Sequence, residues 1–424
     1  MTKLYRLRHS TAEDRRLQTI LAAEARAVAH HTIASENTCR AVQRVAIFTE
    51  AFLPKVDGVS RTALLTIRHL QQTGRKVIVF APWPAPSHIA ETPIYAVPSL
   101  WLPSYPETRV APPSPFVLPT LRRFQPDLIH LFSPFSLGAI GMVAGGWLRV
   151  PVVANYQTDL PAYTKIYGAE AFYSAFTGIL RYLHNGCTLN LAPTAIVRRG
   201  LAASGFKRLR VWERGVDTHR FNPMRRTHEW RQRLLNGRDP DRLVVLYVGR
   251  FAREKRLETL RLIAADRRFA LTLVGGGHHE GEVRRALCEG GADPHFIGYQ
   301  LGDDLANAYA AADIFAFCGT AETFGQVVLE AMASGLPALV PDRGGVASLV
   351  ADGERGFICR ADDASDFHAK ALSLAEDAAL RSKMSHAARQ YAEAQSWTQV
   401  MYQLERYYAE AVCLYGRYRK MQQA

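Results

Sequence analysis

Short runs of apolar, often β-branched residues alternate along the chain with longer segments in which apolar residues recur every three or four positions. The run RVAIFTE is followed by the Pro/Gly turn PKVDG, by a helix-like segment at 59–74 and by the run KVIVFA. Such alternation is typical of a parallel sheet covered by helices. The pattern therefore predicts an α/β fold of doubly wound units. Further strands are expected at IYAV, DLIHLF, VPVVANY, TLNLA and LRVW.

The alternation stops once and then restarts, which predicts two domains in this chain of 424 residues. The second series of strands is expected at LVVLYVGR, FALTLVGGG, HFIGY, DIFAFC, LPALVP and GFICR. We expect a first Rossmann-like domain at 44–213, a polar, arginine-rich linker at 214–240 and a second Rossmann-like domain at 241–395. Residues 1–43 are expected to form an N-terminal extension with one amphipathic helix, and residues 396–424 a C-terminal helix that returns to the first domain.

Composition and charge limit the classes of binding partner that the protein can have. Hydrophobic residues make up 48% of the chain, which excludes a disordered protein, and the formal net charge of +13 favours phosphorylated small molecules, lipid surfaces or nucleic acid. The six cysteines contain no CxxC pair, and we expect buried thiols in a reducing cytoplasm. The N-terminus lacks the apolar segment of a secretory signal, which also favours a cytoplasmic protein.

Two facing parallel sheets are expected to bind ligands in the cleft at the carboxyl ends of their strands. The strand LVVLYVG ends there with Gly249, followed by Arg250 and, five residues later, Lys255. Glycine lets the backbone approach a ligand, a guanidinium binds phosphate oxygens in pairs, and a lysine adds a mobile charge. The pattern predicts a diphosphate clamp that needs no metal. Ordinary surface charges are the alternative.

A second pattern, ETFGQVVLE followed by AMASGLP, places two glutamates eight residues apart. Phe324 or Gly325 is expected to begin a helix whose first N–H groups point at an anion in the cleft. Glu322 would precede this helix and Glu330 would lie inside it, roughly 12 Å away by helical rise. This exceeds the separation of paired glycosidase carboxylates. We expect the two glutamates to bind a sugar ring and a ribose diol; capping or solvated glutamates are the alternative.

Together, GR(x4)K, EtFGqvvlEAmasGlP and the turn Gly344-Gly345 resemble the donor half of retaining glycosyltransferase family 4, which has the GT-B fold. In the first half, FTEAFLPKVDGVSRT, HLFSPFSLGAIG, NYQTDLPAY and VWERGVDTHRFNP resemble the branch of GDP-mannose-dependent α-mannosyltransferases and sulfoquinovosyl-diacylglycerol synthases. The resemblance covers about residues 44 to 420. It implies metal-independent, same-face transfer of a hexose, with mannose favoured, from a nucleotide-diphosphate sugar to a lipid or glycolipid acceptor.

The resemblance also implies roles for single residues. Arg250 and Lys255 would neutralise the diphosphate leaving group, and Glu330 would accept hydrogen bonds from the ribose. Glu322, with the amides around Phe324 and Gly325, would hold the sugar. The residues implied in donor binding are Gly58, Gly249, Arg250, Lys255, Glu322, Phe324, Gly325 and Glu330, of which Arg250, Lys255 and Glu322 are implied in catalysis. No bound metal or other cofactor is implied.

The acceptor side is expected at Gln157, Asp159 and Tyr163. Many relatives carry a histidine at the position of Gln157, and a neutral amide can bind a sugar but cannot take a proton. This argues against a histidine-assisted mechanism. The turn GGGH replaces the usual Gly-Asp-Gly-Pro near the base, so the donor, GDP-mannose or a UDP-sugar, stays open.

The aromatic segment between Tyr156 and His184 either packs in the core or forms an interfacial helix that admits a lipid. Residues 198–238 contain twelve Lys or Arg and three Asp or Glu, which favours anionic headgroups on the inner face of the membrane. A solvated charged face is the alternative.

Two other functions also remain open, a sulfoquinovosyl- or glucosyl-diacylglycerol synthase and a basic nucleic-acid-binding protein. No nucleic-acid reader motif is present, so we expect no nucleic-acid partner.

Overall fold

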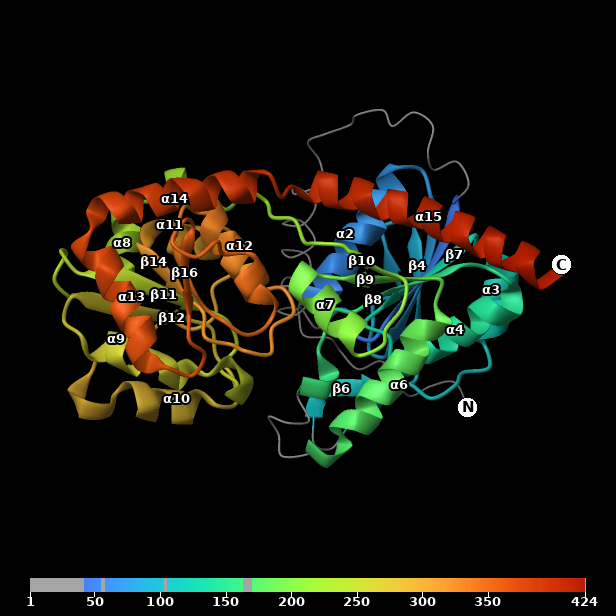
Figure 1. Cartoon of the computed structure of the whole chain (residues 1–424), viewed down its shortest axis with the longest axis horizontal. Helices are drawn as coiled ribbons and strands as arrows, with labels where there is room; N and C mark the ends of the chain where they lie inside the picture. Colours follow the sequence, from blue (N-terminus) through green and yellow to red (C-terminus); the bar gives the residue numbers. More distant parts are fainter. Residues whose placement is uncertain (1–41, 55–57, 103–104, 163–169, 424) are drawn as a thin grey trace, which may run out of the picture.

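Two parallel sheets, each covered by helices, form two lobes (Figure 1). The computed structural model describes residues 42–54, 58–102, 105–162 and 170–423. The helix predicted within 1–43 therefore lies outside the described residues except for the last two positions, and Tyr163 also lies outside them.

The first sheet has the described strand order β10-β9-β8-β7-β1-β2-β4-β3, parallel except for the edge strand β3. Its strands are β1 (Arg44–Thr49), β2 (Lys76–Pro82), β3 (His88–Ile89), β4 (Thr92–Val97), β7 (Leu128–Phe132), β8 (Val152–Asn155), β9 (Leu189–Ala192) and β10 (Leu209–Val211). Around it lie α2 (Gly58–Gln72), α3 (Val117–Phe124), α4 (Ser136–Leu148), α6 (Tyr173–Gly186), α7 (Ala195–Ala203) and the hairpin of β5 (Leu100–Leu102) and β6 (Tyr105–Val110). Because helices cover both faces, the central strands are mostly apolar, and His130 and Asn155 are buried polar exceptions.

The second sheet is parallel, with the described order β13-β12-β11-β14-β15-β16. Its strands are β11 (Leu243–Val248), β12 (Phe269–Val274), β13 (His295–Phe296), β14 (Ile314–Ala316), β15 (Ala338–Pro341) and β16 (Gly356–Cys359). Its helices are α8 (His228–Leu235), α9 (Arg261–Ala265), α10 (Glu280–Leu287), α11 (Gly302–Ala311), α12 (Gln326–Ala333), α13 (Ala364–Glu376) and α14 (Ala378–Glu393). One buried apolar core joins this sheet to its helices, including α8.

The chain passes between the two lobes at two places that lie side by side. Val216 forms a parallel bridge with Ser396, and its N–H donates to the carbonyl of Gln395 at 2.9 Å. Beyond this crossing, α15 (Trp397–Gln423) continues the line of α14 and packs on the first lobe (Figure 1). Its residues Leu404 and Tyr408 belong to the same core cluster as strands of the first sheet. The two crossings form one narrow connection between the lobes.

The predicted α/β fold with two Rossmann-like units is confirmed. The predicted domain boundaries stay a prediction, and the segment 214–240 contains the helix α8, whose Leu234 is fully buried in the second core. The prediction of buried cysteines was wrong for Cys288, which follows the end of α10, and for Cys413 on α15, since both are exposed. Among the described helices, none combines the length and the apolar character required to cross a bilayer.

Candidate active site

The start of α12 is fixed by a glycine-rich contact. Gly325 is the N-cap residue with φ of +93°, a conformation that favours glycine, and a Cβ there would lie 2.4 Å from Cγ1 of Val346. The Gly344-Gly345 turn packs on the same loop: the N–H of Gly345 donates to the carbonyl of Glu322 at 2.6 Å. The helix begins at Gln326, directly after the predicted start at Phe324 or Gly325, and its N-cap Gly325 lies in a closely packed loop.

Lys255 and Glu322 meet at this loop. The Lys255 ammonium lies 2.5 Å from Oε2 of Glu322 and 5.4 Å from the ring centre of Phe317. Burial raises the pKa of Glu322, but the charges of Lys255 and Arg250 outweigh this effect and hold the pKa below its ordinary value. Glu322 is therefore ionised at neutral pH. These two residues, predicted from separate motifs, form one ion pair.

Arg250 lies at the carboxyl end of β11, and its guanidinium donates to Oε1 of the buried Glu254 at 3.1 Å. Close backbone contact shapes this end of the sheet: a Cβ on Gly275 would lie 1.9 Å from the carbonyl oxygen of Gly249. Lys255 ends a short 3₁₀ turn (Arg253–Lys255), and the next residue, Arg256, adopts a left-handed conformation with φ of +53°. Arg250 keeps a partly exposed side chain, 44% of it accessible.

Glu330 is buried inside α12 and joins the two domains. Its Oε1 lies 2.5 Å from the guanidinium of Arg61, and its Oε2 accepts from the hydroxyl of Tyr309 at 3.4 Å. Arg61 belongs to the first turn of α2, which begins with the exposed Gly58. No atom would lie within 4 Å of a Cβ on Gly58 in the described structure. The start of α2 thus lies near the donor-side helix, and the predicted ribose ligand Glu330 already has partners.

On the acceptor side, the hydroxyl of Thr323 donates to the carbonyl of Gln157 at 2.5 Å. This contact joins the loop after β8 to the loop before α12, so the carboxyl ends of the two sheets face each other. Asp159 accepts from the Tyr156 hydroxyl at 3.0 Å and from the N–H of Ala162 at 3.2 Å.

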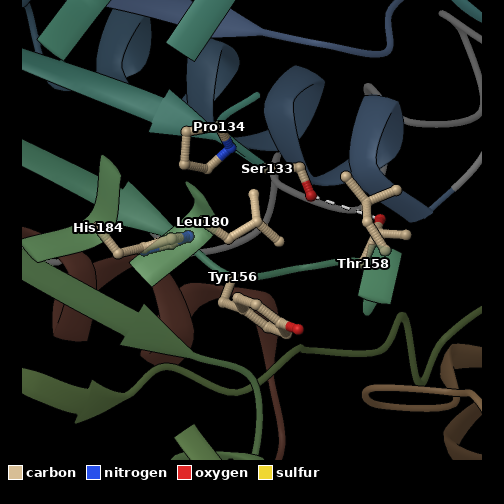
Figure 2. A pocket seen from close by; sticks show the side chains of 7 residues that line it. Ser133, Pro134, Tyr156, Thr158, Leu180 and His184 are labelled. Carbon is tan, nitrogen blue, oxygen red and sulfur yellow. Dashed lines mark hydrogen bonds between the residues drawn. The ribbon is translucent and has the colours of Figure 1, made fainter. Parts of the chain in front are cut away.

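A pocket lies beside these residues, between the loops after β7 and β8 and the helix α6 (Figure 2). The pocket is lined by Ser133, Pro134, Tyr156, Thr158, Leu160, Leu180 and His184. Figure 2 shows the Ser133 hydroxyl pointing toward Thr158, at 3.4 Å. Burial lowers the pKa of His184 to about 4, so this histidine is neutral at physiological pH. The pocket is mostly apolar and uncharged.

The structure adds Glu50, which the sequence analysis missed. It follows β1, and its carboxylate accepts from the N–H groups of Phe135 and Gly138 at 2.7 and 2.8 Å and from the Ser136 hydroxyl at 3.1 Å. Burial raises the pKa of Glu50 to about 7. The residue fixes the start of α4 beside the pocket. The available signal was an acidic residue directly after a strand at the cleft.

Two Rossmann-like units whose strand ends face each other, with a lysine–glutamate pair at the helix between them, define a GT-B glycosyltransferase. Residues 56–220 match the family model "Glycosyltransferase Family 4" and residues 229–391 match "Glycosyl transferases group 1". The chain belongs to glycosyltransferase family 4. The predicted family, fold and enzyme class are confirmed, and the family favours an enzyme over the nucleic-acid-binding alternative. The roles predicted for single residues stay predictions.

The chain is similar to two named mannosyltransferases and a plant relative. A GDP-mannose-dependent alpha-mannosyltransferase of Mycobacterium tuberculosis is 38% identical over 321 residues, 74% of this chain and 83% of the relative. Another of Corynebacterium glutamicum is 33% identical over 384 residues, 88% and 90% of the two chains. A sulfoquinovosyl transferase of Arabidopsis thaliana is 32% identical over 365 residues, 84% and 71% of the two chains.

Solved structures show the same fold. Anabaena HepE in complex with UDP has a TM-score of 0.71 at 19% identity and covers 87% of this chain and 100% of its own. Sucrose-phosphate synthase from Thermosynechococcus elongatus has a TM-score of 0.68 at 21% identity and covers 87% and 98%.

Proposed function

We propose that this protein transfers a hexose from a nucleotide-diphosphate sugar to a lipid or glycolipid acceptor with retention of the anomeric configuration. The observation that carries the proposal is the Lys255–Glu322 ion pair at the start of α12, between the strand ends of both domains. GDP-mannose is the favoured donor because similar proteins from three bacteria are named GDP-mannose-dependent alpha-mannosyltransferases. A UDP-sugar is the second candidate, since the Arabidopsis relative is named a sulfoquinovosyl transferase and two others alpha-monoglucosyldiacylglycerol synthases.

In the proposed mechanism, the acceptor hydroxyl attacks the anomeric carbon from the face that the diphosphate leaves. The bond between this carbon and the phosphate oxygen breaks, and the acceptor proton passes to that oxygen. Lys255, Arg250 and the N–H groups of α12 stabilise the leaving diphosphate, so the protein contributes positioning and fixed charge and needs no metal. Glu322 accepts hydrogen bonds from the sugar hydroxyls, and Glu330 accepts hydrogen bonds from the ribose beside its ion pair with Arg61.

The test is incubation of the purified protein with labelled GDP-mannose, UDP-glucose or UDP-sulfoquinovose and a lipid extract, with and without EDTA. We expect an α-mannosyl lipid from GDP-mannose in both conditions, identified by mass spectrometry and by the coupling constant of its anomeric proton. Inverted products, or no product from any donor, would contradict the transfer proposal. Activity abolished by EDTA would contradict only metal independence.

We further propose that the enzyme works as a peripheral protein on the inner face of the membrane. Large apolar side chains are exposed on adjacent helices: Val143 and Trp147 on α4, Phe172 just before α6, and Ile179 and Tyr182 on α6, with exposed fractions from 43% to 74%. We call this set the α4–α6 surface. Figure 1 shows the two helices side by side.

An anionic bilayer fits the α4–α6 surface better than a protein partner. The exposed Arg149 and Arg181 lie directly beside its apolar residues in the chain, which gives a basic rim around an apolar centre. Helix α6 also contributes Leu180 and His184 to the pocket. A lipid acceptor held at this surface would therefore present its headgroup near the pocket.

A further inference from the structure

Three polar side chains are buried without adequate partners at the carboxyl end of the first sheet. Asn155, Gln157 and Arg214 are only 1%, 8% and 6% exposed. Neither amide atom of Asn155 or of Gln157 has a hydrogen-bond partner in the described part of the chain. The Arg214 guanidinium makes one long hydrogen bond, 3.4 Å, to the carbonyl of Trp212 and lies 5.0 Å from the centre of that ring. Among the described residues, no carboxylate forms an ion pair with it.

Asn155 lies on the same face of the sheet as the buried His130. Asn155 is the register partner of Phe132, so it shares a face with His130, two positions earlier on β7. Gln157 follows Asn155 by two positions, in the loop directly after β8. Burial and then the charge of Arg214 lower the pKa of His130 to about 3, with Asn155 acting in the opposite direction. The Trp212 ring centre lies 6.1 Å from that of His130 and 5.0 Å from the Arg214 guanidinium, so one ring separates Arg214 from this neutral histidine.

The cluster faces the proposed donor site. Thr323, in the loop before α12, donates to the carbonyl of Gln157, and the Gln326 side chain, at the first position of α12, donates to the carbonyl of Gly215 at 3.0 Å. Both contacts come from residues flanking the N-cap Gly325. Asn155, Gln157 and Arg214 therefore lie where the two domains close around the end of α12, beside the place proposed for the transferred sugar.

A buried cation without an ion-pair partner and four buried amide atoms without hydrogen bonds are unfavourable in a folded protein, unless a ligand supplies the missing charge and hydrogen bonds. A guanidinium offers a planar pair of donors, and each amide adds N–H donors. This set matches a compact anionic group with several acceptor oxygens better than it matches a single neutral hydroxyl. We propose that Arg214, Asn155 and Gln157 form an oxyanion subsite that binds a sulfonate, phosphate or carboxylate of a substrate. The assignment of this anion to a substrate rests on the proposed function. The binding of an anion by the three side chains does not rest on it.

Thermal unfolding tests anion binding without any assay of activity. The full chain, R214Q and K255A are unfolded in sodium chloride and in sodium phosphate of equal ionic strength. We expect phosphate to raise Tm of the wild type and of K255A more than that of R214Q, because a ligand stabilises only the folded protein that binds it. We also expect R214Q to be at least as stable as the wild type in chloride, since an unpaired buried charge is removed.

Equal phosphate-dependent shifts in the wild type and R214Q would overturn the subsite. A shift lost in K255A and kept in R214Q would also overturn it, because phosphate would then bind the diphosphate clamp. If R214Q does not fold, the double variant N155A/Q157A replaces it, and only the smaller phosphate-dependent rise of Tm is expected of it, since it removes both amides but keeps the arginine.

Calorimetric titration with matched pairs of ligands, one pair for the donor and one for the acceptor, identifies which substrate carries the anion. UDP-glucuronate carries a carboxylate where UDP-glucose carries a hydroxymethyl group, and glycerol 3-phosphate carries a phosphate that glycerol lacks. We expect the charged member of one pair to bind the wild type at least about tenfold more tightly, a preference that R214Q loses, while UDP alone binds both equally. A preference for neither charged ligand overturns the assignment to a substrate. If no nucleotide binds but the phosphate effect persists, the proposed function fails and the subsite stands.

Discussion

Lys255 and Glu322 neutralise each other in the described structure, at 2.5 Å. A diphosphate that binds Lys255 releases Glu322 toward the sugar, so one ion pair is exchanged for contacts to both ends of the donor. We expect K255A and E322Q each to lower kcat/KM by about 10²–10³-fold, the usual effect of removing one charge-stabilising group. R253A is the matched control, because Arg253 is exposed on the same 3₁₀ turn, and it should keep normal activity. Normal turnover of K255A with the true donor would contradict the proposed clamp.

Glu50 predicts a measurable pH dependence of stability. Burial raises its pKa to about 7, above the ordinary 4.5, so the folded protein binds this proton more tightly than the unfolded chain. The contribution of Glu50 to the free energy of unfolding is fully present below pH 4.5 and is lost as the pH rises to about 7. The free energy of unfolding falls over this range by at most about 1.4 kcal/mol per pH unit. In urea unfolding, E50Q should lack this decline. The neutral histidines His130 and His184 titrate with the opposite sign in both proteins and cancel in the comparison. Identical pH profiles would show that the carboxylate is ionised throughout.

The sequence predicted residues that belong to local motifs and missed those that depend on long-range pairing. Lys255 and Glu322 each lie in a spacing with its own chemical meaning. Arg61 meets Glu330 across 269 positions, and Arg214 lies in an arginine-rich passage whose other members are mostly surface charges. Nothing in a single sequence distinguishes a buried arginine from a solvated one. The oxyanion cluster was therefore visible only after the strands were in register.

At the scale of elements, apolar runs located the strands well because parallel strands are buried on both faces. The start of α12 was also predictable, since Phe-Gly before an apolar helix allows few alternatives. The ends of short helical turns were not predictable from the sequence. The chain after β11 forms two short 3₁₀ turns before α9, and Arg256 separates them because it adopts a left-handed conformation. The aromatic segment likewise proved partly core and partly surface, with Leu183 buried and Tyr182 exposed on one helix.

The packing of the glycine turn on the loop before α12 gives a prediction at this scale. A Cβ on Gly345 would lie 1.8 Å from the carbonyl oxygen of Thr323, so G345A must displace the loop that carries Glu322. We expect kcat/KM to fall by about 10-fold or more, because small displacements of positioned groups cost activity. In G200A, a Cβ meets nothing within 4 Å inside α7, so activity should be normal and stability higher by about 0.4–1 kcal/mol. Equal activities of both variants would show that the loop tolerates displacement.

The α4–α6 surface predicts reversible membrane binding. The full chain should sediment with vesicles of anionic phospholipid at low salt and be released at high salt, because the basic rim is screened. The double variant W147S/Y182S should lose most of this binding. Y418S is the control, since Tyr418 is 60% exposed on α15, away from this surface. Equal recovery with neutral and anionic vesicles would remove the electrostatic part of the proposal, and equal binding of both variants would remove the surface.

At the scale of the whole molecule, the chain passes between the lobes at one narrow crossing, at Val216 and Ser396, and side chains such as those of Arg61 and Glu330 also join the lobes. Helix α7 of the first lobe also lies against the turn Gly345–Ser348 of the second. One connection with separate closing contacts is the arrangement expected of a hinge. The donor-side and acceptor-side groups are assembled only while these contacts hold, so catalysis should depend on the closed population.

The Arg61–Glu330 ion pair allows this dependence to be tested. It joins α2 to α12 at 2.5 Å, with side chains 19% and 3% exposed, so R61A removes a charged contact between the lobes and leaves a buried carboxylate without this cation, which favours separation of the lobes. We expect the radius of gyration from small-angle X-ray scattering to increase in R61A without ligand. The KM for the donor should rise in proportion to the lost closed population. R210A is the control, because Arg210 pairs with Glu410 inside the first lobe, also at 2.5 Å. An unchanged radius and KM in R61A would mean that the remaining contacts, from Thr323 to Gln157 and from Gln326 to Gly215, hold the lobes closed without this ion pair.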